Sequence, residues 1–242
     1  MKRYYFLLFF LITTLTSTAQ FKLFNGNWYA GGEAGIFNNQ TRMITGELGK
    51  YTAGSSGILT VYGFKVGYNY TPSLSIETGI SALPLNLVFV YQTDKVVGGN
   101  YLNFIALPIR INYKIYALNK KIEAFTSLGF QYIYHNPTDI QSFSGKIIAT
   151  KHTSPDTLSY TGSVEVLRRN TFNAEFGIGV NWTLSKRWTL TIYGRQSVGL
   201  MNVALVNVSI KDNQNPVEAA QFLSRGTGLS IGFGVRYNFK TK

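Results

Sequence analysis

Apolar and polar residues alternate with a period of two along most of the chain after residue 27. A period of two is typical of strands whose two faces meet different surroundings. One face of each run carries large apolar or aromatic residues, and the other carries glycine, small polar and charged residues. Eight strands are predicted in this way, at residues 28–36, 58–70, 74–81, 104–115, 122–134, 172–184, 188–195 and 229–239.

The connections between these strands alternate between short and long. Short turns are predicted near Pro72, Asn119 and Ser185, and the long connections are 38–57, 82–100, 135–170 and 199–226. An even number of strands with this alternation is typical of transmembrane barrels. We therefore predict an all-β fold, an eight-stranded antiparallel transmembrane up-and-down β-barrel with short periplasmic turns and long extracellular loops.

A soluble β-sandwich or lipocalin-like barrel also alternates and is the alternative fold. Two features favour the membrane. Aromatic residues of the apolar faces gather near strand ends, where interfacial girdles form. The opposite faces are rich in glycine and charge, whereas a soluble barrel turns its apolar face inward.

The first twenty residues predict export. Lys2 and Arg3 precede an apolar run at 4–15, and the small residues at 17–19 precede Gln20, which is the pattern of a cleaved signal peptide. The predicted organisation is a signal peptide at 1–19 and an outer-membrane barrel domain at 20–242. A retained helical anchor is the alternative, but the apolar run is short for a membrane span.

Composition narrows the chemistry. The chain has no cysteine, which excludes disulfides, thiolate metal sites and a lipid-modified cysteine. Its 23 Lys and Arg against 11 Asp and Glu give a net charge of +12, but these residues are scattered and an exported chain does not meet nucleic acid. Attraction to outer-membrane lipid or glycolipid explains the basic balance, and a merely solvated surface is the alternative.

The ionisable residues within the strands fall almost entirely on the polar faces. A lysine or arginine facing lipid at the bilayer midplane would cost about 2–4 kcal/mol, so this segregation defines the lumen. Charges alternate in sign between neighbouring strands, and Arg236 on the last strand is expected to meet Glu33 on the first. The predicted lumen charge network is Glu33, Lys65, Glu77, Arg110, Lys114, Glu123, Glu175, Arg195 and Arg236.

Two roles are open for this network. An eight-stranded barrel has an interior about wide enough for side chains to fill, so a structural plug is expected. A narrow or gated conduction path is the alternative, because rings of charge set selectivity in wider pores.

Catalytic and cofactor motifs are weak. Both histidines, His135 and His152, fall in the third long connection, together with Asp139, Ser142, Ser154, Asp156 and Ser159. A hydrolase or acyltransferase at the barrel rim could use such residues, but no nucleophile elbow or histidine-pair metal motif occurs. We predict no enzyme, no catalytic residues, no cofactor and no metal site, with a rim-located lipid-modifying enzyme as the alternative function.

The second and fourth long connections also contain alternating apolar residues, at 85–91 and 203–210. We expect strands that continue above the membrane. The alternative is an edge that binds a protein partner by strand addition.

Three segments resemble the Bacteroidetes outer-membrane β-barrel family, which includes PorT-like proteins. They are 101–110 (YLNFIALPIR), 193–203 (YGRQSVGLMNV) and 229–237 (LSIGFGVRY), and Ala19-Gln20 is similar to the cleavage junction of that family. Ala106 and the residues after Phe239 depart from its pattern. The resemblance implies a non-enzymatic outer-membrane barrel, and PorT-like members are associated with protein secretion. The predicted function is a structural, interaction or secretion-accessory protein that acts through its extracellular loops.

Overall fold

The computed structural model describes residues 27–46, 51–53, 59–91, 96–119, 121–135, 141–151, 154–212 and 218–239. The predicted signal peptide lies outside these residues. Every regular element within them is a β-strand. No helix of the described part is long and apolar enough to cross a membrane.

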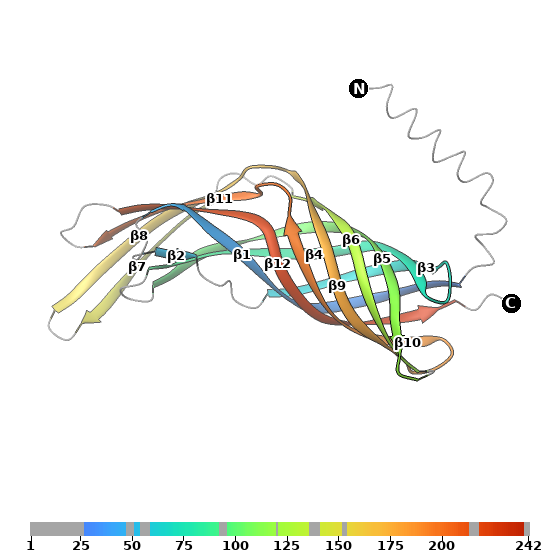
Figure 1. The fold of residues 1–242 in the computed structure, drawn as a ribbon. Coiled ribbons are helices and arrows are strands. Elements are labelled where there is room, and N and C mark those ends of the chain that lie inside the picture. Colours follow the sequence, from blue (N-terminus) through green and yellow to red (C-terminus); the bar gives the residue numbers. More distant parts are fainter. Residues whose placement is uncertain are drawn as a thin grey trace, which may run out of the picture.

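Within the described residues, eight strands pair in an antiparallel ring that closes on itself (Figure 1). The ring is sealed by the first and last strands, where Tyr29 lies opposite Asn238 and Asn39 opposite Gly228. The predicted eight-stranded antiparallel barrel is confirmed. In ring order the strands are β1 (Asn27–Thr45), β3 (Leu59–Asn69), β4 (Leu74–Tyr91), β5 (Val96–Ala117), β6 (Ile122–Tyr134), β9 (Asn170–Thr183), β10 (Trp188–Gly199) and β12 (Glu218–Asn238).

Four further strands lie among the predicted long connections: β2 (Tyr51–Ala53), β7 (Gln141–Lys151), β8 (Ser154–Val166) and β11 (Ala204–Asp212). β4 and β5 continue as a hairpin to Tyr91 and Val96, and β11 pairs with β12, so the predicted strand continuations are confirmed. The predicted long connection 135–170 also contains a hairpin of β7 and β8 that attaches to β11, which the sequence pattern did not predict. These strands project from one end of the barrel, the extended end (Figure 1).

The opposite end, the short-turn end, carries three tight turns at the predicted places. In each, one side-chain oxygen accepts hydrogen bonds from two backbone N–H groups after it. Thr71 Oγ1 accepts from Ser73 and Leu74, Asn119 Oδ1 from Lys121 and Ile122, and Ser185 Oγ from Arg187 and Trp188, at 2.7–3.3 Å. Short polar side chains of this kind replace ladder partners where a chain reverses.

The outer face of the barrel is an apolar belt. Phe64, Ile109, Phe130, Ile178 and Phe233 are each more than half exposed, and similar side chains surround them on every strand of the ring. Water disfavours so large a continuous apolar surface, whereas hydrocarbon accepts it. Tryptophan and tyrosine edge this belt at the short-turn end, where Trp28 packs on Tyr68 and Trp188 on Tyr237, as in membrane interfaces.

Inside the barrel, large side chains lie over glycines on the neighbouring strand. Tyr29 is directly opposite Gly67, and a Cβ added to Gly67 would be 2.2 Å from Tyr29 Cζ. Phe125 and Gly179 form a second such pair, and Tyr193 and Gly232 a third. Lumen glycines therefore make room for inward aromatic rings, as strand glycines do where another group approaches closely.

This packing gives the first prediction. Gly67→Ala should displace the Tyr29 ring and lower the free energy of unfolding by about 1–3 kcal/mol, the usual cost of overpacking. Gly32→Ala is the matched control, because its Cβ would face outward with its nearest neighbour 3.7 Å away. Urea unfolding of both variants in lipid vesicles measures the difference. Equal unfolding midpoints for the two variants would contradict the packing argument.

Candidate functional site in the barrel lumen

Six charged side chains meet at one level of the lumen. β1 contributes Glu33, β3 Lys65, β4 Glu77, β5 Arg110, β9 Glu175 and β10 Arg195, and each side chain is at most 4% exposed. Neighbouring strands bring them together because inward positions recur every second residue and the register aligns them, as with Glu77 opposite Arg110. We call these six residues the buried charge layer.

Arg110 reaches three of the carboxylates. Its Nε and Nη2 donate to the two oxygens of Glu175 at 2.5 and 3.2 Å, a bidentate arrangement. Its Nη1 donates to Glu33 Oε1 at 3.2 Å and to Glu77 Oε1 at 3.3 Å. A planar guanidinium suits this task, because its donors are fixed in directions that several carboxylates can share.

Arg195 and Lys65 complete the pairing. Arg195 Nη1 donates to both oxygens of Glu33, at 3.1 and 3.0 Å, and its guanidinium stacks on the Tyr193 ring at 3.6 Å from the centroid. Lys65 Nζ lies 3.6 Å from Glu33 Oε2 and 3.5 Å from Glu77 Oε2. Every carboxylate of the layer therefore has at least two cationic neighbours.

The layer contains three carboxylates and three cations, so its formal charges cancel. Burying ions costs several kcal/mol each unless partners and hydrogen bonds replace water. Neutral groups supply the additional bonds: Tyr29 donates to Glu77 Oε2 at 3.2 Å, and Gln131 donates to Glu175. The arrangement is a charge-balanced network buried inside the barrel.

Three residues of the predicted network lie apart from this layer, nearer the short-turn end. Lys114 and Glu123 pair with each other and remain about a quarter exposed. Arg236 does not reach Glu33: it lies opposite Gly31 and over the Tyr29 ring, 4.7 Å from its centroid. Arg195 takes the place beside Glu33 that the sequence suggested for Arg236.

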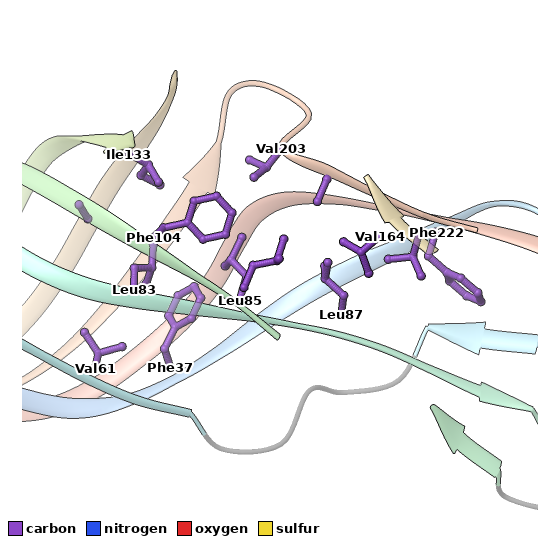
Figure 2. Close-up of a cluster of buried hydrophobic side chains, with 14 of the residues drawn as sticks. Phe37, Val61, Leu83, Leu85, Leu87, Phe104, Ile133, Val164, Val203 and Phe222 are labelled. Carbon is purple, nitrogen blue, oxygen red and sulfur yellow. The ribbon is translucent and has the colours of Figure 1, made fainter. Parts of the chain in front are cut away.

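An apolar cluster occupies the lumen on the other side of the layer, toward the extended end. Leu83, Leu85 and Leu87 follow Glu77 along β4, and Phe104 precedes Arg110 on β5 (Figure 2). The cluster is Phe37, Val61, Leu83, Leu85, Leu87, Leu102, Phe104, Ala106, Ile133, Val164, Val203, Ala204, Val206, Val208, Ala220 and Phe222. These side chains form the buried core between the projecting strands.

Sequence reasoning missed this cluster, although a signal existed. Val61 and Phe104 stand on the inward faces that were interpreted as polar, and inward residues become apolar from Leu83 onward. The change marks the level at which the lumen turns from an ionic to an apolar interior.

The structure describes only some of the rim residues considered for catalysis. His135 is 5% exposed, its Nδ1 donates to the Asn103 carbonyl at 3.0 Å, and its ring stacks on Phe104. Ser142, Ser154, Asp156 and Ser159 lie on β7 and β8, and His152 and Asp139 fall outside the described residues. Within the described part, no group of three or more metal-binding side chains occurs.

Known proteins are similar to this chain in structure at low sequence identity. No protein-family model matches the chain, and no curated protein does. Solved structures that resemble it are outer-membrane barrels. OprG of Pseudomonas aeruginosa is 13% identical over 89% of this chain and 97% of its own (TM-score 0.48), and a major outer membrane protein of Thermus thermophilus is 11% identical over 88% and 99% (0.45). OmpW of E. coli is 13% identical over 88% and 98% (0.42).

Similarity at 11–13% identity does not indicate what the chain binds or does. The resemblance of 101–110, 193–203 and 229–237 to the PorT-like family stays a prediction.

The buried charge layer gives the second prediction. Arg110→Ala leaves Glu175 without its bidentate partner inside the barrel, and breaking such a buried pair typically costs about 3–5 kcal/mol. Lys114→Ala is the control, because that pair is partly exposed and worth about 1 kcal/mol or less. Urea unfolding in lipid vesicles compares the two. A loss of stability for Arg110→Ala no larger than that for Lys114→Ala would contradict the network's structural role.

Proposed function

We propose that the chain is a small, non-enzymatic outer-membrane barrel with a closed lumen, which acts through the strands at its extended end. One observation carries this proposal: two groups of side chains fill the lumen one after the other along its axis. The charge-balanced layer comes first, and the apolar cluster follows it. In this proposal the short-turn end faces the periplasm and the extended end faces outward.

Two physical arguments support closure. The cations and carboxylates of the buried charge layer are engaged with one another across the lumen, which leaves them poorly placed to hydrate a passing ion. The apolar cluster offers ions no compensation for lost water. Either filling alone would oppose conduction, and the two lie in series.

The third prediction tests closure. In planar bilayers the purified chain should give no stable open level, with its folded state checked by heat-dependent gel mobility. A double variant, Leu85→Ala with Phe104→Ala, should also stay closed, because the buried charge layer remains intact. A stable open pore of large conductance in the unmodified chain would overturn the closed-lumen proposal and favour the narrow channel.

The observations at the rim favour interaction over catalysis. The His135 ring is enclosed and its Nδ1–H is held by a backbone carbonyl, so it is not presented to a substrate. The β7–β8 hairpin, in contrast, extends beyond the barrel and pairs on one side through β8 with β11. A projecting sheet edge suits recognition of a protein partner, which fits a structural or secretion-accessory role.

The fourth prediction concerns this hairpin. Removing 146–159 and joining Gly145 to Tyr160 by a two-residue turn keeps the ladder pairs Ser144–Thr161 and Phe143–Gly162. The shortened chain should still show heat-dependent gel mobility but lose proteins that cross-link to the full chain in cells.

A shortened chain that keeps every cross-linked protein would contradict the role of the hairpin. Gly32→Ala is the control, because it alters the outer face of the barrel and leaves the β7–β8 hairpin whole.

A further inference from the structure

The seam between β1 and β12 contains an irregularity at the extended end. Between the pairs Asn39–Gly228 and Thr41–Ser224, β1 has one residue and β12 has three, at 225–227. Gly226 adopts a φ of +73°, which a residue with a side chain rarely takes. β12 pairs with β10 below this bulge and with β11 above it, so the bulge marks the branch point of the sheet.

Hydrogen bonds from the interior hold the bulge in place. The fully buried Asn173 side chain donates from Nδ2 to the Gly226 carbonyl at 3.0 Å, and the Gly226 N–H donates to Ser224 Oγ at 3.3 Å. The Gly199 N–H donates to Thr227 Oγ1 at 3.0 Å. A feature fixed by this many partners is a built element of the barrel, as β-bulges commonly are.

The bulge opens a groove of about 560 Å³ on the outer surface. Two exposed arginines line it from opposite strands, Arg42 on β1 and Arg225 on β12. The Nε of Arg225 donates to Asn202 Oδ1 at 3.1 Å, which fixes the guanidinium. Among the described residues, its two Nη groups have no hydrogen-bond partner. The other lining residues are Gln40, Thr41, Met43, Ile44, Leu223 and Thr227.

No carboxylate lines the groove, and among the described residues neither arginine takes part in an ion pair. In the lumen, by contrast, Arg110 and Arg195 are paired with glutamates. Two guanidinium groups in one groove, neither in an ion pair with a described residue, provide the positive charge and the hydrogen-bond donors that a phosphate needs.

The groove also adjoins the apolar belt. The exposed apolar residues of the belt reach Ile36 on β1 and Leu229 on β12, and one outward residue, Asn38, separates Ile36 from the groove lining at Gln40. A further exposed apolar side chain, Ile44, lines the groove itself. A ligand with an anionic head and acyl chains could therefore place its phosphate between the arginines and its chains along the belt. A free phosphate would use the first of these surfaces only.

We propose that this groove binds the phosphate of a phosphorylated glycolipid in the outer leaflet. The inference rests on the proposed outer-membrane location and on that orientation of the barrel. It assigns Arg42 and Arg225 to the phosphate and assigns Asn202 to positioning Arg225.

The fifth prediction uses native mass spectrometry of the purified full chain released from detergent. Phosphorylated lipid A should remain bound, and the double variant Arg42→Gln with Arg225→Gln should retain it roughly ten-fold less. Arg187→Gln is the matched control, because Arg187 is an exposed arginine at the opposite end, where it bonds Tyr237. This control should retain the lipid as the unmodified chain does.

Two further arms distinguish the sources of phosphate. Lipid A stripped of its phosphates should bind as weakly to the unmodified chain as the intact lipid binds to the double variant. Inorganic phosphate at the same concentration should neither bind nor displace the lipid, because it lacks the acyl chains. Equal retention by the double variant, equal binding of the stripped lipid, or displacement by inorganic phosphate would each overturn the proposal.

Membrane fractionation of the same variants separates this inference from the location on which it rests. Both arginine variants should remain in the outer membrane with heat-dependent gel mobility. Loss of lipid retention with location unchanged supports the groove. Absence of the unmodified chain from the outer membrane would instead overturn the proposed function.

Discussion

The barrel depends on the mutual neutralisation of charged side chains that are buried in its lumen away from water. Its outer face is mainly apolar, and the six side chains of the buried charge layer all point inward. Three glutamates and three basic residues share one level of the lumen, and removing any one would leave an excess of buried charge. The strand register is therefore tied to the pairing, because a shift of one residue would turn these side chains toward lipid.

Space for this network comes from residues that have no side chain. At the level of the buried charge layer β12 contributes Gly234, where an added Cβ would lie 3.4 Å from Glu33 Cβ and 3.5 Å from Lys65 Nζ. Gly177 similarly lies against Arg195, with an added Cβ 2.7 Å from its Cγ. A narrow barrel can hold six long charged side chains because the inward positions beside them, Gly177 and Gly234, have no side chains.

Alternation alone predicted the ring. The eight strands, their inward faces and the turns at Pro72, Asn119 and Ser185 follow from local patterns, since each strand meets lipid on one side and the lumen on the other. The pairs Glu33–Lys65, Glu77–Arg110 and Lys114–Glu123 also follow, because neighbours along the chain are neighbours in the sheet. The predicted contact between Arg236 and Glu33 was wrong because barrel closure pairs β1 with β12, and the register of that pair cannot be deduced from either strand alone.

The projecting strands were harder to predict for a related reason. β8 contains Pro155, Asp156 and Gly162, which disfavour a strand assignment, and its order comes from pairing with β11 rather than from its own pattern. The apolar cluster is likewise non-local, since it joins Phe37 on β1 to Val206 on β11 and Phe222 on β12. The groove lies at a bulge at 225–227, where β12 changes its pairing from β10 to β11. No short sequence pattern predicts such a bulge.

The branching of β12 has a consequence for how the molecule is assembled. Among the described strands β11 pairs only with β8 and β12, and β12 also closes the ring between β10 and β1. One strand thus completes two structures, and it is the last of the described strands. Neither the ring nor the outward sheet has all its partners until β12 is in place, so the two structures form together through contacts between distant parts of the sequence.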